Sequence, residues 1–148
     1  MNEEKRNQKE TGSEVKIFNV PFVLRENQGN LTINTNAPSK PSQEQIINQA
    51  FKFHLEGNIS EAAKYYQLFI NHGFNDHRVF ANYGIILKNL GKLQEAELST
   101  RKAIELNPDF ADTHLNLGNI LEALGKLEEA ELSQRKAIKL NPDYAIAY

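Results

Sequence analysis

Apolar residues recur at helical spacing through the second half of the chain. Phe80, Tyr83 and Leu87 lie at positions i, i+3 and i+7, which places them on one face of a helix. Gly91 is expected to end this helix, because glycine accepts the left-handed conformation at a helix C-terminus. The pattern therefore predicts a helix that stops just before residue 91.

A second apolar series follows at once. Its members are Leu93, Ala96, Ala103, Ile104 and Leu106. Pro108 cannot extend a helix and restricts the residue before it, so this helix is expected to end near residue 107. Asp109 is a candidate N-cap for the next helix, through its side-chain oxygen. At the start of the patterned region, Ser42 and Gln45 have the spacing of a capping box.

The same pattern returns at a fixed interval along the chain. The recurring sets are Gly57, Gly91 and Gly125; Ala62, Ala96 and Ala130; and Asn48, Asn82 and Asn116. The stretches 77–110 and 111–144 are identical at well over half of their positions, and 43–76 aligns in the same register without a gap. Self-similarity with a period of about 34 residues is typical of stacked helix–turn–helix repeats.

Small and charged residues fit this interpretation. Gly84, Ala96 and Ala103 are expected where two helices approach closely. A larger side chain there would cost roughly 1–3 kcal/mol. Glu97–Arg101 and Glu131–Arg135 are i, i+4 pairs, for which a solvated helix face is the expected setting.

Place by place, the unit resembles the tetratricopeptide repeat (TPR). The second repeat has the residue types typical of the family at Phe80, Tyr83-Gly84, Leu87, Gly91, Ala96, Ala103 and Pro108. It departs from the family at Thr100, a position that is usually aromatic. The resemblance implies an all-α, right-handed α-solenoid of three repeats, at residues 43–76, 77–110 and 111–144. Residues 1–42 are expected to be a largely disordered or extended segment, and residues 145–148 to begin a truncated fourth repeat.

In this family the first helix of each repeat lines a concave groove. The resemblance therefore implies a ligand-binding set on these helices. Its members are Asn48, Phe51, Arg78, Asn82, Ile85, Lys88, Asn89, Asn116, Asn119 and Glu122.

Three asparagines at one place stand out, because asparagine is a poor residue for a helix interior. One interpretation is a ladder of amides that binds the backbone of an extended peptide, since each amide both donates and accepts a hydrogen bond. This row is similar to the asparagine ladder of O-linked N-acetylglucosamine transferases. The alternative is that asparagine was inherited with the duplicated repeat and only tolerates solvent.

Other chemistry is less favoured. Arg78 and Lys88 suggest a carboxylate clamp, but Asp112 and Glu122 at the matching places of the third repeat argue against it. The four histidines fall at four different places without the i, i+4 spacing of a helical metal site, so packing or solvent is their expected role. We find no phosphate-binding glycine loop and no nucleophile motif. The sequence predicts a chain that is not an enzyme, with no catalytic residues, metal or cofactor.

The composition of the chain limits the kinds of partner that it can bind. The chain has 148 residues, 24% of them charged, with a net charge of −2, which is too small to attract nucleic acid or anionic lipid. It has no cysteine, and no apolar run long enough to cross a bilayer. A cytoplasmic protein with a protein or peptide partner is the expectation.

The two ends differ from the repeats. Phe18, Val20, Phe22 and Leu24 alternate in residues 15–24, which suggests an extended segment, with Pro21 limiting its place in any sheet. At the other end, Leu132 and its neighbours are expected to be partly uncovered. The uncovered end suggests either a longer protein or self-association of two copies.

Two functions remain open. The first is a TPR interaction scaffold that binds a peptide or a partner domain in its groove. The second is the N-terminal substrate-recognition arm of a larger glycosyltransferase or sulfotransferase, as the resemblance to bacterial repeat proteins suggests.

Overall fold

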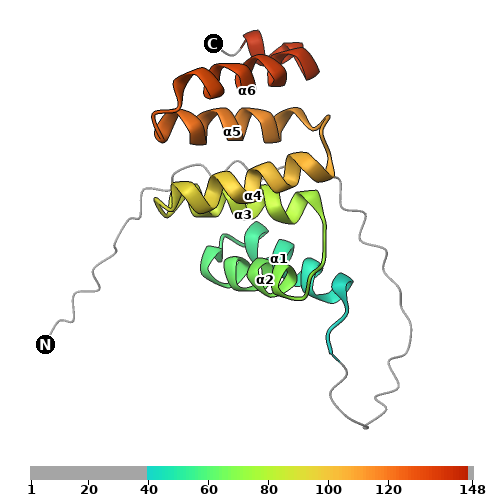
Figure 1. The fold of residues 1–148 in the computed structure, drawn as a ribbon. Helices are drawn as coiled ribbons and strands as arrows, with labels where there is room; N and C mark the ends of the chain where they lie inside the picture. The colour runs from blue at the N-terminus through green and yellow to red at the C-terminus, as the bar shows by residue number, and fades with distance from the viewer. Residues whose placement is uncertain (1–39, 147–148) are drawn as a thin grey trace, which may run out of the picture.

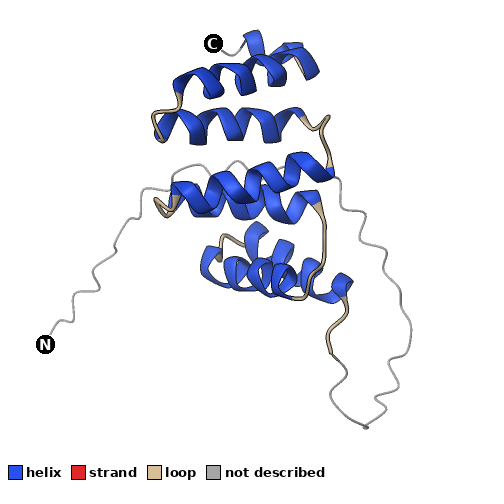
Figure 2. Cartoon of the chain, viewed as in Figure 1, coloured by secondary structure: helices blue, strands red, loops and turns tan. Residues whose placement is uncertain are grey.

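Six α-helices form the folded part of the chain, which the computed structural model describes over residues 40–146 (Figure 1). They are α1 (Gln43–Leu55), α2 (Ile59–Asn71), α3 (His77–Asn89), α4 (Leu93–Leu106), α5 (Ala111–Ala123) and α6 (Leu127–Leu140), followed by a 3-10 turn, η1 (Pro142–Ile146). Within these residues no strand occurs (Figure 2). The predicted extended segment 15–24 and Tyr148 lie outside the described residues.

The helices pair and the pairs stack. Each of the three repeats holds one helix pair, and α4 packs on α5 as the second repeat meets the third (Figure 1). The two chain ends of the described region lie at opposite ends of the stack. The prediction of an all-α solenoid is therefore confirmed.

Glycine ends the first helix of every repeat. Gly57, Gly91 and Gly125 adopt φ values of 74°, 75° and 75°, in the left-handed region that side chains with a Cβ disfavour. The N–H of Gly91 bonds to the carbonyl of Lys88, and the N–H of Lys92 bonds to that of Leu87. These bonds satisfy carbonyls that the end of the helix would otherwise leave unpaired.

The predicted helix starts are half right. Ser42 and Gln45 form the expected capping box, with Gln45 N–H donating to Ser42 Oγ at 3.2 Å and Ser42 N–H donating to Gln45 Oε1 at 2.9 Å. The prediction that Asp109 caps the next helix is wrong. α5 begins at Ala111 with Phe110 as its N-cap, so Asp109 is one residue too early to cap it.

Close helix contact within each repeat depends on the small residues. A Cβ on Gly84 would collide with Oγ1 of Thr100 and would lie 3.3 Å from the carbonyl oxygen of Ala96. A Cβ on Gly118 would lie 2.6 Å from Cγ of Gln134. Both glycines are on the first helix of their repeat and face the second, so the predicted crossing points are confirmed.

One predicted solvated pair is instead built into the stack. Glu97 is only 9% exposed, and its carboxylate accepts bonds from Arg101 at 2.9 Å and from Lys126 at 2.8 Å. Arg101 also reaches Glu129 on α6 at 2.6 Å. The hydrogen bond from Lys126, with that from Arg101, holds the pKa of Glu97 below its ordinary value although burial alone would raise it. The pattern along one helix could not show these partners, because they come from the next repeat.

Two surface facts complete the fold. Leu132 on α6 is 65% exposed, but Leu98 at the same position of the inner helix α4 is 71% exposed, so this exposure does not depend on the end of the stack. Across residues 40–146, none of the helices has both the length and the apolar character needed to span a bilayer.

We predict that Gly84→Leu strongly destabilises the domain, because the added side chain must separate α3 from α4. Overpacking of this kind costs roughly 1–3 kcal/mol or more. Urea unfolding followed by circular dichroism measures the loss. Ala123→Leu, which adds a similar side chain at an exposed position of α5, serves as the control and should leave stability nearly unchanged. Equal stability of the two variants would contradict the observed helix pairing.

Candidate binding groove

The predicted groove residues lie on the first helices of the three repeats. We call this set the groove face. Asn48 and Phe51 come from α1, the members from Arg78 to Asn89 come from α3, and Asn116, Asn119 and Glu122 come from α5. Most are half-buried, Asn89 and Glu122 are exposed, and Asn82 is buried. The structure thus brings the set onto successive helices, but its members differ in access to solvent.

The three asparagines at the shared place are not equivalent. Asn48 and Asn116 are half-buried, whereas Asn82 is 5% exposed. The amide nitrogen of Asn82 donates to the hydroxyl of Tyr66 at 3.4 Å. Asn82 therefore belongs in part to the contact between the first two repeats, while Asn48 and Asn116 keep part of their surface exposed.

A buried histidine completes this polar contact. His54 on α1 is 1% exposed, and its Nδ1 lies 2.7 Å from the hydroxyl of Tyr66. The tautomer of His54 sets which of the two groups donates in this bond. His54 Nε2 and Asn82 Oδ1 are both buried without a hydrogen-bond partner in the described part of the chain.

Aromatic rings pack against the ring of Tyr66. The Tyr66 ring meets Phe51 edge-on at 6.1 Å between centroids and lies 6.4 Å from Tyr83. Burial lowers the pKa of His54 below its ordinary value of 6.5 and raises that of Tyr66, the latter against a smaller lowering by the Asn82 bond. Both groups are therefore neutral at physiological pH. The expectation that histidines serve packing holds for His54, but its polar partners were missed.

Arg78 reaches across from α3 to α1. Its guanidinium carbon lies 5.3 Å from the centre of the Phe51 ring, which is a cation–π contact. Two bonds join it to Asp76, Nε to Oδ1 at 3.0 Å and a terminal nitrogen to Oδ2 at 2.7 Å. The bond from Arg78 holds the pKa of Asp76 below its ordinary value although burial alone would raise it. Because Arg78 is already neutralised by Asp76, the geometry gives no support to a carboxylate clamp.

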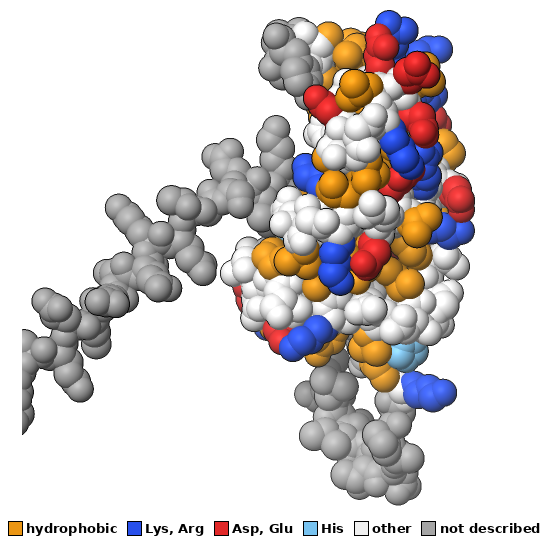
Figure 3. Space-filling model, turned by 60° about the vertical axis from the view of Figure 1, so that its left-hand side comes forward, with side chains coloured by type: hydrophobic (Ala, Val, Ile, Leu, Met, Phe, Trp, Pro, Cys, Tyr) orange, Lys and Arg blue, Asp and Glu red, His pale blue; other side chains and the backbone are white. Residues whose placement is uncertain are grey.

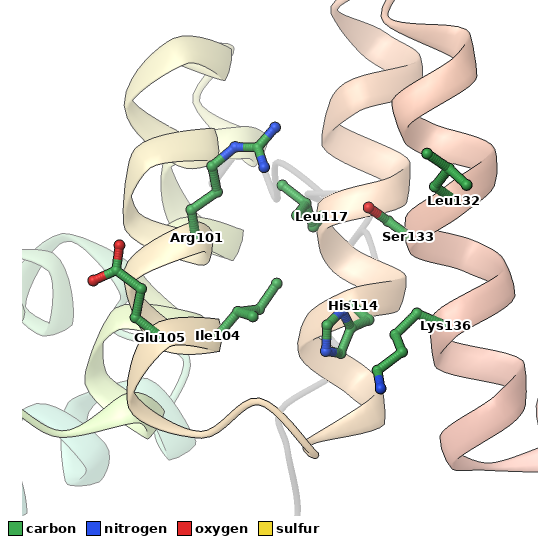
Figure 4. Close-up of a pocket in the computed structure, with 8 residues that line it drawn as sticks. All are labelled: Arg101, Ile104, Glu105, His114, Leu117, Leu132, Ser133 and Lys136. Carbon is green, nitrogen blue, oxygen red and sulfur yellow. The ribbon is translucent and has the colours of Figure 1, made fainter.

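A second feature is an open hollow of about 450 Å³ between α4, α5 and α6 (Figure 4). Ile104 from α4 points toward His114 of α5, and Leu117 points back toward Arg101. Its full lining is Arg101, Ile104, Glu105, His114, Leu117, Leu132, Ser133 and Lys136. The hollow has an apolar base and a charged rim, and none of its residues belongs to the groove face.

The face of the molecule drawn in Figure 3 carries charges of both signs. Blue and red side chains stand next to one another on the face drawn in Figure 3, among scattered hydrophobic ones. Over residues 40–146, no three His, Asp or Glu side chains are gathered so as to hold a metal ion. The groove face is therefore the candidate site. Where the first repeat meets the second, its amides lie near the aromatic rings of Phe51 and Tyr66.

Comparisons with known proteins agree with this geometry. Tetratricopeptide repeat family models match residues 77–110 and 100–131. A comparison with curated protein sequences finds no significant match. Residues 77–131 therefore carry tetratricopeptide repeats.

Solved structures show the same fold. The Thermobaculum terrenum O-GlcNAc transferase superposes with a TM-score of 0.62 at 24% identity, over 69% of this chain and 20% of the transferase. MamA gives a TM-score of 0.64 at 20% identity, over 68% of this chain and 59% of its own. The second TPR domain of Spaghetti (RPAP3), solved with an HSP90 peptide, gives 0.61 at 24% identity, over 67% and 94%. The chain thus spans about a fifth of the transferase and less than two-thirds of MamA.

Acid should destabilise the fold as the pH falls below about 6.5. Burial is the main reason that the pKa values of His54 and His77 lie below 6.5 in the folded protein, so the unfolded chain binds more protons below that pH. The free energy of unfolding is expected to be level above about pH 7 and to fall as pH drops from 6.5 toward 5, by at most about 1.4 kcal/mol per pH unit for each histidine. Urea titrations at a series of pH values measure it.

His54→Gln is the matched variant, because glutamine keeps a hydrogen-bonding group near Tyr66 and does not titrate. It should be less stable at pH 7.5 and should lose part of the pH dependence. Asp76 and Glu97 do not interfere, since their pKa values are lowered from 3.8 and 4.5 and they titrate at more acid pH. A wild-type stability that stays level down to pH 5 would refute the assignment.

Proposed function

We propose that the protein is a scaffold that binds an extended peptide, or an extended segment of a partner domain, along the groove face. The observation that carries this proposal is the pair of half-exposed amides of Asn48 and Asn116, at one place of the repeat, with Asn82 between them. In this proposal the chain carries no catalytic machinery of its own and acts by holding its partner.

The chemistry of the face suits a peptide backbone. A carboxamide donates and accepts, so it pairs with a peptide N–H and C=O whatever the side chains of the ligand. The amide nitrogen of Asn82 bonds to Tyr66 and its oxygen is buried, so the amides that a ligand can reach are those of Asn48 and Asn116. Half-buried Ile85 and Phe51 add apolar contact beside these amides.

Structural neighbours support a peptide as the partner class. The RPAP3 domain was solved with an HSP90 peptide, and the TPR2B domain of yeast Sti1, with a TM-score of 0.60 at 21% identity over 68% of this chain and 81% of its own, is described in an Hsp70 complex. The charge pattern of this face differs from what a carboxylate ligand needs, because Asp76 holds Arg78. We therefore expect recognition through the peptide backbone and apolar side chains.

The second candidate is the substrate-recognition arm of a larger transferase. It is favoured by the superposition on the T. terrenum O-GlcNAc transferase, of which this chain covers a fifth. Reading the gene beyond the codon for Tyr148 separates the two. More repeats followed by a catalytic domain would favour the arm, and a stop codon would favour the scaffold.

Replacing the two open amides should weaken binding without unfolding the domain. An array of short peptides screened with the full chain supplies a binding sequence, and fluorescence anisotropy then measures its Kd. A net hydrogen bond is worth about 0.5–1.5 kcal/mol, so Asn48→Ala/Asn116→Ala is expected to raise Kd roughly 5- to 100-fold. The control is Asn71→Ala, an exposed asparagine of α2 that is not part of the groove face.

Two results would count against the proposal. One is an unchanged Kd in the double variant while Asn71→Ala behaves like the wild type. The other is an array on which no peptide binds above background.

A further inference from the structure

The first repeat has an uncovered outer edge. α1 and α2 lie at the end of the described stack, and no other described helix lies beyond them (Figure 1). On this edge is a hollow of about 340 Å³. It is lined by Pro41, Gln45, Ile46, Gln49, Tyr65 and Leu68.

The equivalent surfaces of the second and third repeats show which kind of side chain packs against such an edge. Counting one repeat on from Ile46, Gln49, Tyr65 and Leu68 gives Phe80, Tyr83, Ser99 and Lys102, and counting again gives His114, Leu117, Ser133 and Lys136. In the inner repeats the second helix of the preceding repeat packs an apolar side chain against part of this surface. Ile70 of α2 packs against the cluster that holds Phe80, and Ile104 of α4 packs against the cluster that holds Leu117. The first repeat has the same surface and lacks a covering helix among the described residues.

The sequence upstream of the first repeat does not supply another one. Val23 and Gln28 stand where a repeat in this register would have its glycine and its first alanine. The longest apolar stretch in this upstream part is instead residues 15–24, which lie outside the described residues. Phe18 and Phe22 are its two aromatic residues, and residues 17–24 contain no charge.

We propose that residues 15–24 of the same chain dock on the outer edge of α1 and α2, with a phenylalanine in the hollow between Ile46 and Leu68. This segment takes the place that an apolar residue of a preceding helix, such as Ile70 or Ile104, takes in the inner repeats. The edge can accept an apolar side chain, since Leu68 is 36% exposed beside the buried Ile46 and every side chain that lines the hollow is uncharged.

The tether makes this docking feasible. Residues 25–40 separate Leu24 from Pro41, and a chain of this length spans up to about 55 Å when extended. A flexible tether of this length holds the segment at an effective concentration in the millimolar range, so a weak apolar contact is enough to populate the docked state.

The edge suits the segment better than the hollow between α4, α5 and α6. The latter already has Ile104 in the covering position, and its rim carries the charges of Arg101, Glu105 and Lys136. An uncharged apolar segment would have to desolvate those charges. The two sites therefore make different predictions, and one experiment separates them.

The test compares two double variants of the full chain by methyl NMR and thermal unfolding. Phe18→Ser/Phe22→Ser removes the proposed contact, and Leu31→Ser/Ile33→Ser removes as many apolar side chains from the same upstream part. Because aromatic rings shift nearby methyl resonances, the methyl groups of Ile46 and Leu68 should move in the first variant. Those of Ile104 and Leu132 should not, and the control should move neither set. The melting temperature should fall by a few degrees in the first variant only.

Three results would overturn the proposal. Unmoved Ile46 and Leu68 resonances in the phenylalanine variant would show that the segment does not dock there. Changes at Ile104 and Leu132 would place it in the other hollow. A difference between wild type and variant that disappears on dilution to low micromolar protein would show docking between copies rather than within one chain.

Discussion

Close approach of the two helices within each repeat is the constraint on which the rest of the structure depends. Gly84 and Gly118 leave no room for a Cβ against the helices that follow them, and Ala96 and Ala130 supply the opposing surface. These small residues return at the same positions of the second and third repeats, whereas the first repeat has Ala50 where the others have glycine. In all three repeats the two helices contact each other and the pairs stack. The groove face lies on the first helices, of which α3 and α5 contact each other.

The first junction differs from the second in chemistry. The hydroxyl of Tyr66 forms hydrogen bonds with His54 of the first repeat and Asn82 of the second. Thr100, at the equivalent position of the second repeat, instead donates to the carbonyl of Ala96 in its own helix. At the second junction the stack is joined instead by ions, with Glu97 held by Arg101 and Lys126. One repeated fold thus carries a neutral polar contact at one junction and an ion-pair network at the other, and only the first borders Asn82 of the groove face.

The helices and turns could be predicted from the sequence, because each depends on residues close together in the chain. The apolar spacing of Phe80, Tyr83 and Leu87 with Gly91 after them predicted α3 and its end, and the capping box at Ser42 predicted the start of α1. What the sequence could not show were contacts between repeats. Glu97 looked solvated because its partner Lys126 lies in the next repeat, and the bond between His54 and Asn82 through Tyr66 needs three helices to be placed. The prediction that Asp109 caps α5 was wrong by one residue, because a sequence pattern does not locate a helix start that finely.

Native-state amide hydrogen exchange tests the stacked pairs most directly, because it reports the free energy of opening at each residue. α3, α4 and α5 are covered on both sides by neighbouring helices, so their central amides should exchange only through global unfolding. α6 has only η1 beyond it, so its amides should open with a lower free energy than those of α3, α4 and α5. Equal protection along all six helices, or weak protection at Gly84 and Ala96 where the pair is closest, would contradict the account.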